Sequence, residues 1–147
     1  MSYCLAIDIG ASSGRHLLCE MGHSARIVLA AGNFPAQSMG KNAIVIRADG
    51  HGTCELLEAI LEVFPLDTYV EKPVSLMEVM KGDTVETPIW KDYERIVANA
   101  DARGADAIGT IERFAFYEQA KTAYAIIATG ESALYANVML QKGVVTD

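Results

Sequence analysis

The sequence predicts a single α/β domain of three layers, in which helices cover both faces of a largely parallel β-sheet. Two observations favour this fold. Short apolar runs rich in β-branched residues alternate with segments whose apolar residues recur at helical spacing. In addition, the 147 residues contain no linker, internal repeat or low-complexity tract. A right-handed path of strand, helix and parallel strand within one domain therefore accounts for the whole pattern.

Turn and cap residues divide the first half of the chain into short elements. Gly22 suits the end of a short helix, because glycine often follows the last helical residue. Thr53 has the properties of a helix N-cap, and Pro65 ends the helix that follows it. We expect helices at residues 14–21 and 53–64, strands at residues 26–31 and 43–46, and a turn at residues 32–35.

The second half repeats the alternation of strand and helix. Pro88 suits the first position of a helix, and Gly104 suits its end. The inward stripe of that helix is expected to contain Ile89, Tyr93, Ile96, Val97 and Ala100. We expect strands at residues 73–80, 105–111 and 124–129, a helix around the aromatic residues 114–117, and a last apolar run entered through residues 135–137.

Composition excludes several classes of partner. The formal net charge of −7 would repel nucleic-acid phosphates and anionic membrane surfaces. No apolar run is long enough to span a bilayer, and the N-terminal residues lack the basic start of a secretory signal. Cys4, Cys19 and Cys54 form an odd, widely spaced set without a CxxC pair, which favours a reducing compartment. We expect a cytoplasmic protein that binds neither nucleic acid nor membrane.

The N-terminal stretch YCLAIDIGASSGR, residues 3–15, predicts a short strand and a turn of small residues. The stretch resembles the start of sugar kinases of the actin-like class, in which backbone amides hold phosphate and a carboxylate holds Mg²⁺. Such kinases need two large domains, and nothing after Arg15 supplies a second phosphate loop. We therefore expect residues 1–16 to be an appended leader and residues 17–147 to form the α/β domain, without a cofactor or metal.

Five short motifs occur in order along that domain: MGH, NFPAQSMG, VIRADGHG, RFAFYE and YANVML. Together they resemble the family of L-fucose mutarotases and D-ribose pyranases, on the fucose side, from Leu17 to the C-terminus. The resemblance implies a cofactor-free isomerase that interconverts the α and β anomers of L-fucose or a related aldose. It also implies a ring-shaped homo-oligomer, such as a decamer, in which a neighbouring subunit completes the sugar site.

His23 is the candidate catalytic residue. It lies between a glycine that ends a helix and the start of a strand, so its ring is expected at the rim of the sheet. Imidazole can give and take a proton near neutral pH. Spacing alone would favour a surface or capping histidine. The resemblance assigns this position to the proton donor of the family.

Four further residues are candidates for substrate binding. Arg113 offers five hydrogen-bond donors that suit sugar oxygens, although without the resemblance a surface ion pair with Glu112 or Glu118 would be favoured. Tyr135 and Asn137 offer a phenol and a carboxamide. The resemblance assigns sugar binding to Arg113, Tyr135, Ala136 and Asn137, with Ala136 acting through its backbone.

Two positions depart from the family pattern. Ala25 and Ala31 stand where the family usually carries acidic residues, the first expected to orient the imidazole and the second to bind sugar hydroxyls. Each loss could remove one or a few kcal/mol of transition-state or binding energy. An alternative function is therefore a sugar-binding or assembly module of the same fold with weakened catalysis.

Overall fold

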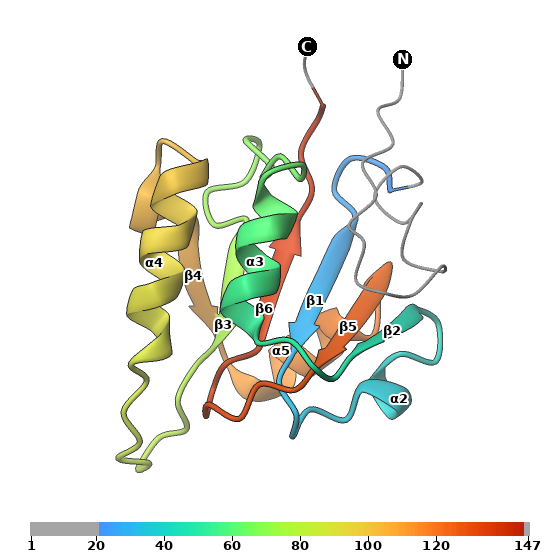
Figure 1. Ribbon diagram of the computed structural model, residues 1–147, viewed down its shortest axis with the longest axis vertical. Helices are drawn as coiled ribbons and strands as arrows, with labels where there is room; N and C mark the ends of the chain where they lie inside the picture. The colour runs from blue at the N-terminus through green and yellow to red at the C-terminus, as the bar shows by residue number, and fades with distance from the viewer. Residues whose placement is uncertain (1–20, 146–147) are drawn as a thin grey trace.

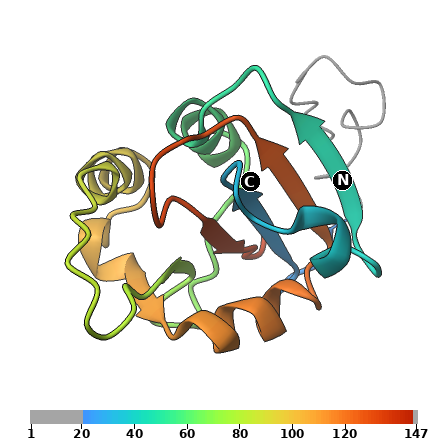
Figure 2. The same ribbon diagram turned by 90° about the horizontal axis from the view of Figure 1, so that it is seen from below.

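The computed structural model describes residues 21–145, which form three layers. A six-stranded sheet lies between two pairs of helices (Figures 1 and 2). The elements are β1 (Arg26–Ala30), α2 (Ala36–Met39), β2 (Ile44–Ala48), α3 (Thr53–Leu61), β3 (Val74–Met77), α4 (Ile89–Ala100), the 3₁₀ helix η2 (Gly104–Ala107), β4 (Ile108–Ile111), α5 (Arg113–Ala120), β5 (Ala125–Thr129) and β6 (Val138–Gln141). The expected leader and the expected helix at residues 14–21 lie outside or at the edge of this range.

The strands follow the order β2-β5-β1-β6-β3-β4 across the sheet. The pairs β2 with β5, β5 with β1, and β3 with β4 are parallel. Only β6 runs against its neighbours β1 and β3 among the described strands. The prediction of a largely parallel sheet between helical layers is therefore confirmed. The reversed strand places the chain before β6 at the edge where the other strands end.

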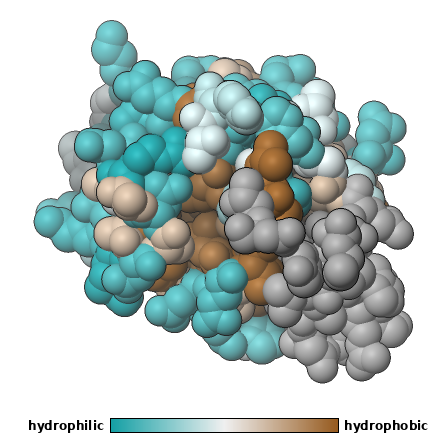
Figure 3. All heavy atoms as spheres, turned by 90° about the horizontal axis from the view of Figure 1, so that it is seen from above, coloured by the Kyte–Doolittle hydropathy of each residue, from teal (hydrophilic) through white to brown (hydrophobic). Residues whose placement is uncertain are grey.

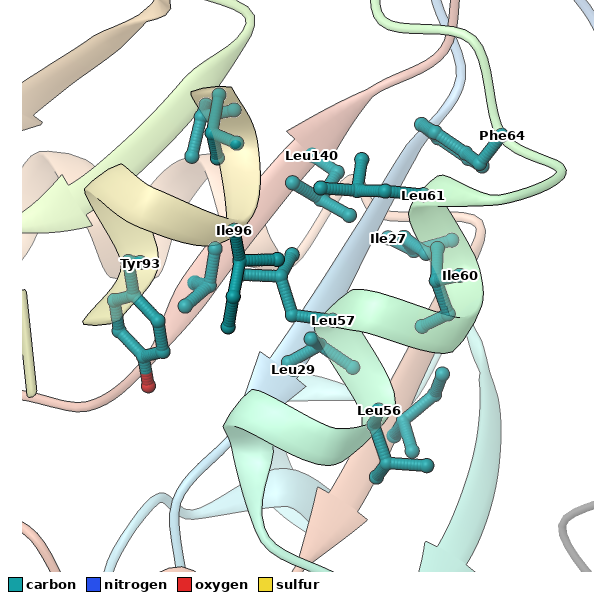
Figure 4. Packing of buried hydrophobic residues seen from close by; sticks show 14 of the residues in the cluster. Ile27, Leu29, Leu56, Leu57, Ile60, Leu61, Phe64, Tyr93, Ile96 and Leu140 are labelled. Atoms are coloured by element: carbon teal, nitrogen blue, oxygen red, sulfur yellow. The ribbon is translucent and has the colours of Figure 1, made fainter. Parts of the chain in front are cut away.

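The core has two parts, one on each face of the sheet. Helices α3 and α4 pack side by side on one face, where Leu57, Ile60 and Ile96 meet Leu29 from β1 (Figure 4). Helices α2 and α5 cover the other face. There Phe116 is fully buried among residues of the sheet. None of the described helices is long and apolar enough to cross a membrane.

Most expected elements are present, with differences at their ends. β3 stops at Met77 because its partner β4 ends at the paired residue Ile111, so no strand continues toward residue 80. The strand expected from residue 105 starts only at Ile108, after the turn of η2. The four residues that follow the expected turn at residues 32–35, for which no element was predicted, form α2. Ala100 is exposed, because α4 ends there and leaves the core.

The expected N-cap role of Thr53 is wrong by one residue. Gly52 occupies the cap position, and Thr53 is the first residue of α3, fully buried. Its amide N–H and its hydroxyl donate to the carboxylate of Glu131, both at 3.2 Å. A residue 78 positions later in the chain thus performs the capping that the local sequence assigns to Thr53.

Candidate active site

A pocket of about 320 Å³ lies at the edge where the parallel strands end. Ala31 directly follows β1, Met77 ends β3, and Arg113 begins α5. Tyr135 and Asn137 enter from the segment before β6. Ligands of open α/β sheets bind at this edge, and the volume suits a small molecule. The structure thus brings three of the five predicted site residues into one pocket.

The start of α5 places Arg113 in the pocket wall. The Glu112 carboxylate accepts hydrogen bonds from two amide groups of the first helical turn, so the helix begins at Arg113. The Arg113 guanidinium donates to the Tyr117 hydroxyl at 3.4 Å, a contact that raises the pKa of Arg113. No ion pair within residues 21–145 involves Arg113, so the alternative pairing with Glu112 or Glu118 is not formed. Guanidinium donors remain for a ligand.

Tyr135 is held in an unusual backbone conformation. Its φ angle of 53° lies in the left-handed region, which a residue other than glycine adopts only when its surroundings hold it there. The Trp90 indole N–H donates to the Tyr135 carbonyl at 2.8 Å. The Tyr135 hydroxyl donates to the Asp83 carboxylate at 3.0 Å and accepts from the Met80 amide at 3.3 Å. These contacts fix both ends of the tyrosine.

Asn137 and Ala136 have different surroundings. The Asn137 side-chain oxygen accepts from the Ala31 amide at 2.8 Å, which ties the segment before β6 to the end of β1. Its side-chain N–H groups make no hydrogen bond within residues 21–145 and remain for a ligand. Ala136 is fully buried and does not line the pocket, and its carbonyl accepts from the Tyr93 hydroxyl at 2.6 Å. Sugar contact through the Ala136 backbone stays a prediction.

A buried polar network supports this segment from the opposite face of the sheet. The Tyr93 hydroxyl lies 2.6 Å from the Thr53 hydroxyl, which also donates to Glu131. Burial raises the pKa of Tyr93, so it remains a neutral phenol. Burial by itself would also raise the pKa of Glu131, but hydrogen bonds from the Ala133 amide and from Thr53 lower it overall. The network therefore connects the ionised Glu131 carboxylate to the Ala136 carbonyl behind the pocket.

His23 lies at the other end of β1. His23 lies three residues before the first residue of that strand, and Ala31 directly follows the last. The five residues of the strand therefore separate His23 from Ala31 by about 16 Å, at ~3.3 Å per residue. One chain therefore does not bring His23 to Arg113 and Tyr135. The ring is about half exposed, with its Nε2 atom 3.7 Å from the carboxylate of Asp67 and its edge against Tyr69. The prediction that the ring lies at the rim of the sheet fits this position.

Sequence reasoning missed two carboxylates, one beside His23 and one in the pocket at the other end of β1. Asp67 is fully buried beside His23, and Asp83 lines the pocket near Tyr135. Both lie in loops, where neither spacing nor periodicity signals a role. Ala25 packs against the core, and Ala31 lines the pocket without a polar side chain.

Besides the pocket residues, the described part of the chain contains potential metal-ligating side chains and the Cys54 thiol. No cluster of three or more potential metal ligands occurs among residues 21–145. Burial raises the pKa of the Cys54 thiol, with further contributions from nearby carboxylates such as Asp92. Cys54 is therefore a thiol rather than a thiolate at neutral pH.

The chain belongs to the RbsD / FucU transport protein family, whose pattern matches residues 15–145. It is 50% identical to human fucose mutarotase over 133 residues, which cover 88% of this chain and 85% of the human protein. The solved structure of FucU from Bifidobacterium longum is 62% identical, with a TM-score of 0.92 over 96% of this chain and 99% of that one. The fucose mutarotase of Streptococcus pneumoniae, solved in complex with L-fucose, is 40% identical, with a TM-score of 0.85 and coverage of 96% and 98%.

Proposed function

We propose that this protein is a mutarotase that interconverts the α and β anomers of L-fucose or a closely related aldose. The observation that carries the proposal is the pocket at the strand ends, in which Arg113, Tyr135 and Asn137 present hydrogen-bonding groups from rigid elements. Relatives that are fucose mutarotases share 40 to 50% of their residues with this chain over most of its length. The sugar is neutral, so the net charge of −7 does not oppose its binding.

The reaction needs only paired proton transfer. A base takes the proton from the anomeric hydroxyl while the bond between the anomeric carbon and the ring oxygen breaks and that oxygen takes a proton. The open aldehyde then closes on its other face by the reverse steps. Each well-placed acid or base contributes about 10²–10⁴-fold. His23 is the proposed proton carrier, and Arg113, Tyr135, Asn137 and the Ala136 backbone are the proposed sugar-binding groups.

We further propose that the site is shared between copies of the chain in a ring, because His23 and the pocket lie at opposite ends of one protomer. Both ends carry exposed apolar side chains. Phe114 is 67% and Leu134 52% exposed near the pocket, while Val144 and Val145 are about half exposed in the C-terminal segment. The end that bears this segment has an apolar region bordered by hydrophilic residues (Figure 3). Head-to-tail contact between two different ends is the geometry that closes rings.

The second candidate function is a sugar-binding or assembly module with weak catalysis. The specific observation in its favour is the pair of alanines, Ala25 and Ala31, at the two ends of β1. This candidate predicts that the protein binds L-fucose in calorimetry while the anomers exchange at the uncatalysed rate. Either function is proposed to be cytoplasmic, because the odd, widely spaced cysteines favour a reducing compartment.

The deciding experiment is exchange NMR on L-fucose with and without the protein. The mutarotase proposal predicts faster exchange between anomer signals, lost in His23→Ala. His51→Ala is the matched control, because the His51 side chain pairs with the exposed Glu55 at 2.9 Å, away from the pocket residues. Exchange at the background rate with wild-type protein, together with measurable fucose binding, would establish the second candidate instead.

A further inference from the structure

Asp83 is a pocket residue whose hydrogen-bonding capacity is only partly used within residues 21–145. It lies in the loop between β3 and α4, and it is the one carboxylate among the described residues that line the pocket. Its Oδ1 atom accepts from the Val85 amide at 3.2 Å, and its Oδ2 atom accepts from the Tyr135 hydroxyl at 3.0 Å. A carboxylate has about four acceptor sites, so roughly two remain for a ligand.

The backbone of a tight turn places this carboxylate at the pocket. The Asp83 amide donates to the Met80 carbonyl at 2.9 Å, which closes the turn. Gly82 within the turn has a φ angle of 88°, in the left-handed region that favours glycine. The turn contacts the Tyr135 hydroxyl twice, through the Met80 amide and through the Asp83 carboxylate. Because the Asp83 side chain is exposed, a ligand in the pocket can reach it.

The same two contacts determine what the Tyr135 hydroxyl can offer a sugar. A phenol has one O–H donor and two lone pairs. The donor is used on Asp83, and one lone pair accepts from the Met80 amide at 3.3 Å. One lone pair therefore remains, so Tyr135 can accept a hydrogen bond from a ligand while its own proton stays on Asp83. Asp83 thus supplies acceptors in two ways, directly and by taking the Tyr135 proton.

The rest of the pocket supplies mainly donors. The Arg113 guanidinium has donors only, and the Asn137 side-chain oxygen already accepts from the Ala31 amide at 2.8 Å. Ala31 lines the pocket without a polar side chain. Every sugar hydroxyl has an O–H donor, and burying such a group without an acceptor is unfavourable. The acceptors at Asp83 complement the donors of Arg113 and Asn137.

We propose that Asp83 is a further sugar-binding residue, which accepts a hydrogen bond from one hydroxyl of the aldose and keeps Tyr135 as an acceptor. Asp83 thereby selects aldoses that present a hydroxyl at the matching ring position. An analogue without that hydroxyl leaves a carboxylate unpaired in the occupied pocket, and sites of this kind discriminate strongly against such analogues. The inference rests on the proposed function, because it assumes that this pocket holds the sugar.

The test is calorimetry with L-fucose and with analogues that each lack one ring hydroxyl. Asp83→Asn keeps the shape of the side chain and removes its charge. Because charge-assisted hydrogen bonds are much stronger than neutral ones, we expect the Kd for L-fucose to rise about tenfold. Glu86→Gln is the matched control, since Glu86 is an exposed carboxylate of the same loop that does not line the pocket.

The analogues identify the hydroxyl that contacts Asp83. One of them should bind the wild-type protein about tenfold more weakly than L-fucose does. In Asp83→Asn the same analogue should lose at most about twofold, because the contact is already weakened and the two changes are not additive. The other analogues should lose the same affinity in both proteins.

Tyr135→Phe separates direct sugar contact from action through the tyrosine. If Asp83 contacts the sugar, Asp83→Asn still raises the Kd in Tyr135→Phe protein. No further rise in that background would overturn the proposal, because Asp83 would then act only by holding Tyr135. The analogue series decides the point even where Tyr135→Phe binds too weakly to measure.

The proposal and the proposed function fail in different ways. Equal Kd values for wild type and Asp83→Asn, with L-fucose and with every analogue, would overturn the role of Asp83 and leave the proposed function intact. Wild-type protein that binds no L-fucose would contradict the proposed function, and this inference with it.

Discussion

The two ends of β1 carry the two halves of the proposed site, and they differ in how firmly they are built. At the pocket end, the segment from Tyr135 to Asn137 is tied by hydrogen bonds to α4 and to the end of β1. At the other end, His23 is about half exposed, and within residues 21–145 its ring contacts the side chains of Ser24, Asp67 and Tyr69. The pocket end is held by several hydrogen bonds to neighbouring elements, whereas the histidine end has one buried carboxylate beside it.

Each end also lacks one acidic residue of the family pattern, and each has a carboxylate from a distant loop. Asp67 lies beside His23, where Ala25 offers no charge. Asp83 lies beside Tyr135 and lines the same pocket as Ala31. Carboxylates therefore lie at both ends although positions 25 and 31 are alanine, so the two alanines by themselves do not establish loss of function.

The largest expected effect at the pocket end comes from Arg113→Met. The substitution keeps an apolar stem and removes every donor that could bind sugar oxygens. We expect the Kd for L-fucose to rise about 10–100-fold, since a hydrogen bond from a charged group contributes ~1.5–3 kcal/mol. Calorimetry measures this effect, and Arg95→Met on exposed α4 surface is the control. Unchanged affinity would show that Arg113 does not bind the sugar.

Tyr93→Phe tests the support behind the pocket. It leaves the Ala136 carbonyl and the Thr53 hydroxyl without their shared partner in the core. We expect the free energy of unfolding to fall by about 1–3 kcal/mol in urea denaturation, with weaker sugar binding. Thr53→Ser keeps the hydroxyl and should cost less. A fully stable Tyr93→Phe protein with normal affinity would show that the network does not hold the segment.

Ala31→Asp and Ala25→Asp compare the two ends directly. An Asp at position 31 adds an acceptor at the pocket wall, so the affinity for L-fucose should rise about threefold to tenfold, as one hydrogen bond contributes ~0.5–1.5 kcal/mol. An Asp at position 25 should bring no gain in exchange rate, because Asp67 already lies beside His23. A large gain in exchange rate from Ala25→Asp, without a gain in affinity from Ala31→Asp, would contradict this prediction.

The smallest expected effect is the pH dependence from Glu131. Its folded-state pKa is lowered, so the carboxylate stabilises the fold above its unfolded pKa, near 4.3, and this contribution is lost as pH falls through the lower folded pKa. Glu131→Gln should therefore be less stable than wild type at neutral pH, with the gap closing in acid. Thermal unfolding at several pH values measures it. A gap that widens in acid would contradict the direction of the shift.

Much of the fold could be predicted from the sequence because hydrophobic periodicity and turn residues are local signals. The strands around Val28 and Ile127 and the stripe of α4 at Tyr93 and Ile96 follow such patterns. The capping of α3 by Glu131 could not be predicted, because it joins residues far apart in the chain.

The candidate site also contains some residues that the sequence could predict and others that it could not. Arg113, Tyr135 and Asn137 lie in recognisable motifs and meet in one pocket. The loop residues Asp67 and Asp83 carry no pattern, and only the folded chain places them beside His23 and Tyr135. Residue patterns alone did not indicate that His23 and the pocket lie at opposite ends of one protomer, although the family resemblance implied a site completed by a neighbouring subunit.

The claim that two copies of the chain share one site is tested most directly by mixing two inactive variants. His23→Ala and Arg113→Ala proteins, each inactive in exchange NMR, are unfolded together and refolded as mixed oligomers. A shared site predicts recovery of about one quarter of wild-type activity at equal amounts, because one site in four then pairs an intact histidine end with an intact pocket end. If both residues act within one chain, no mixture has an intact site, and activity at background in verified mixed oligomers would contradict the account.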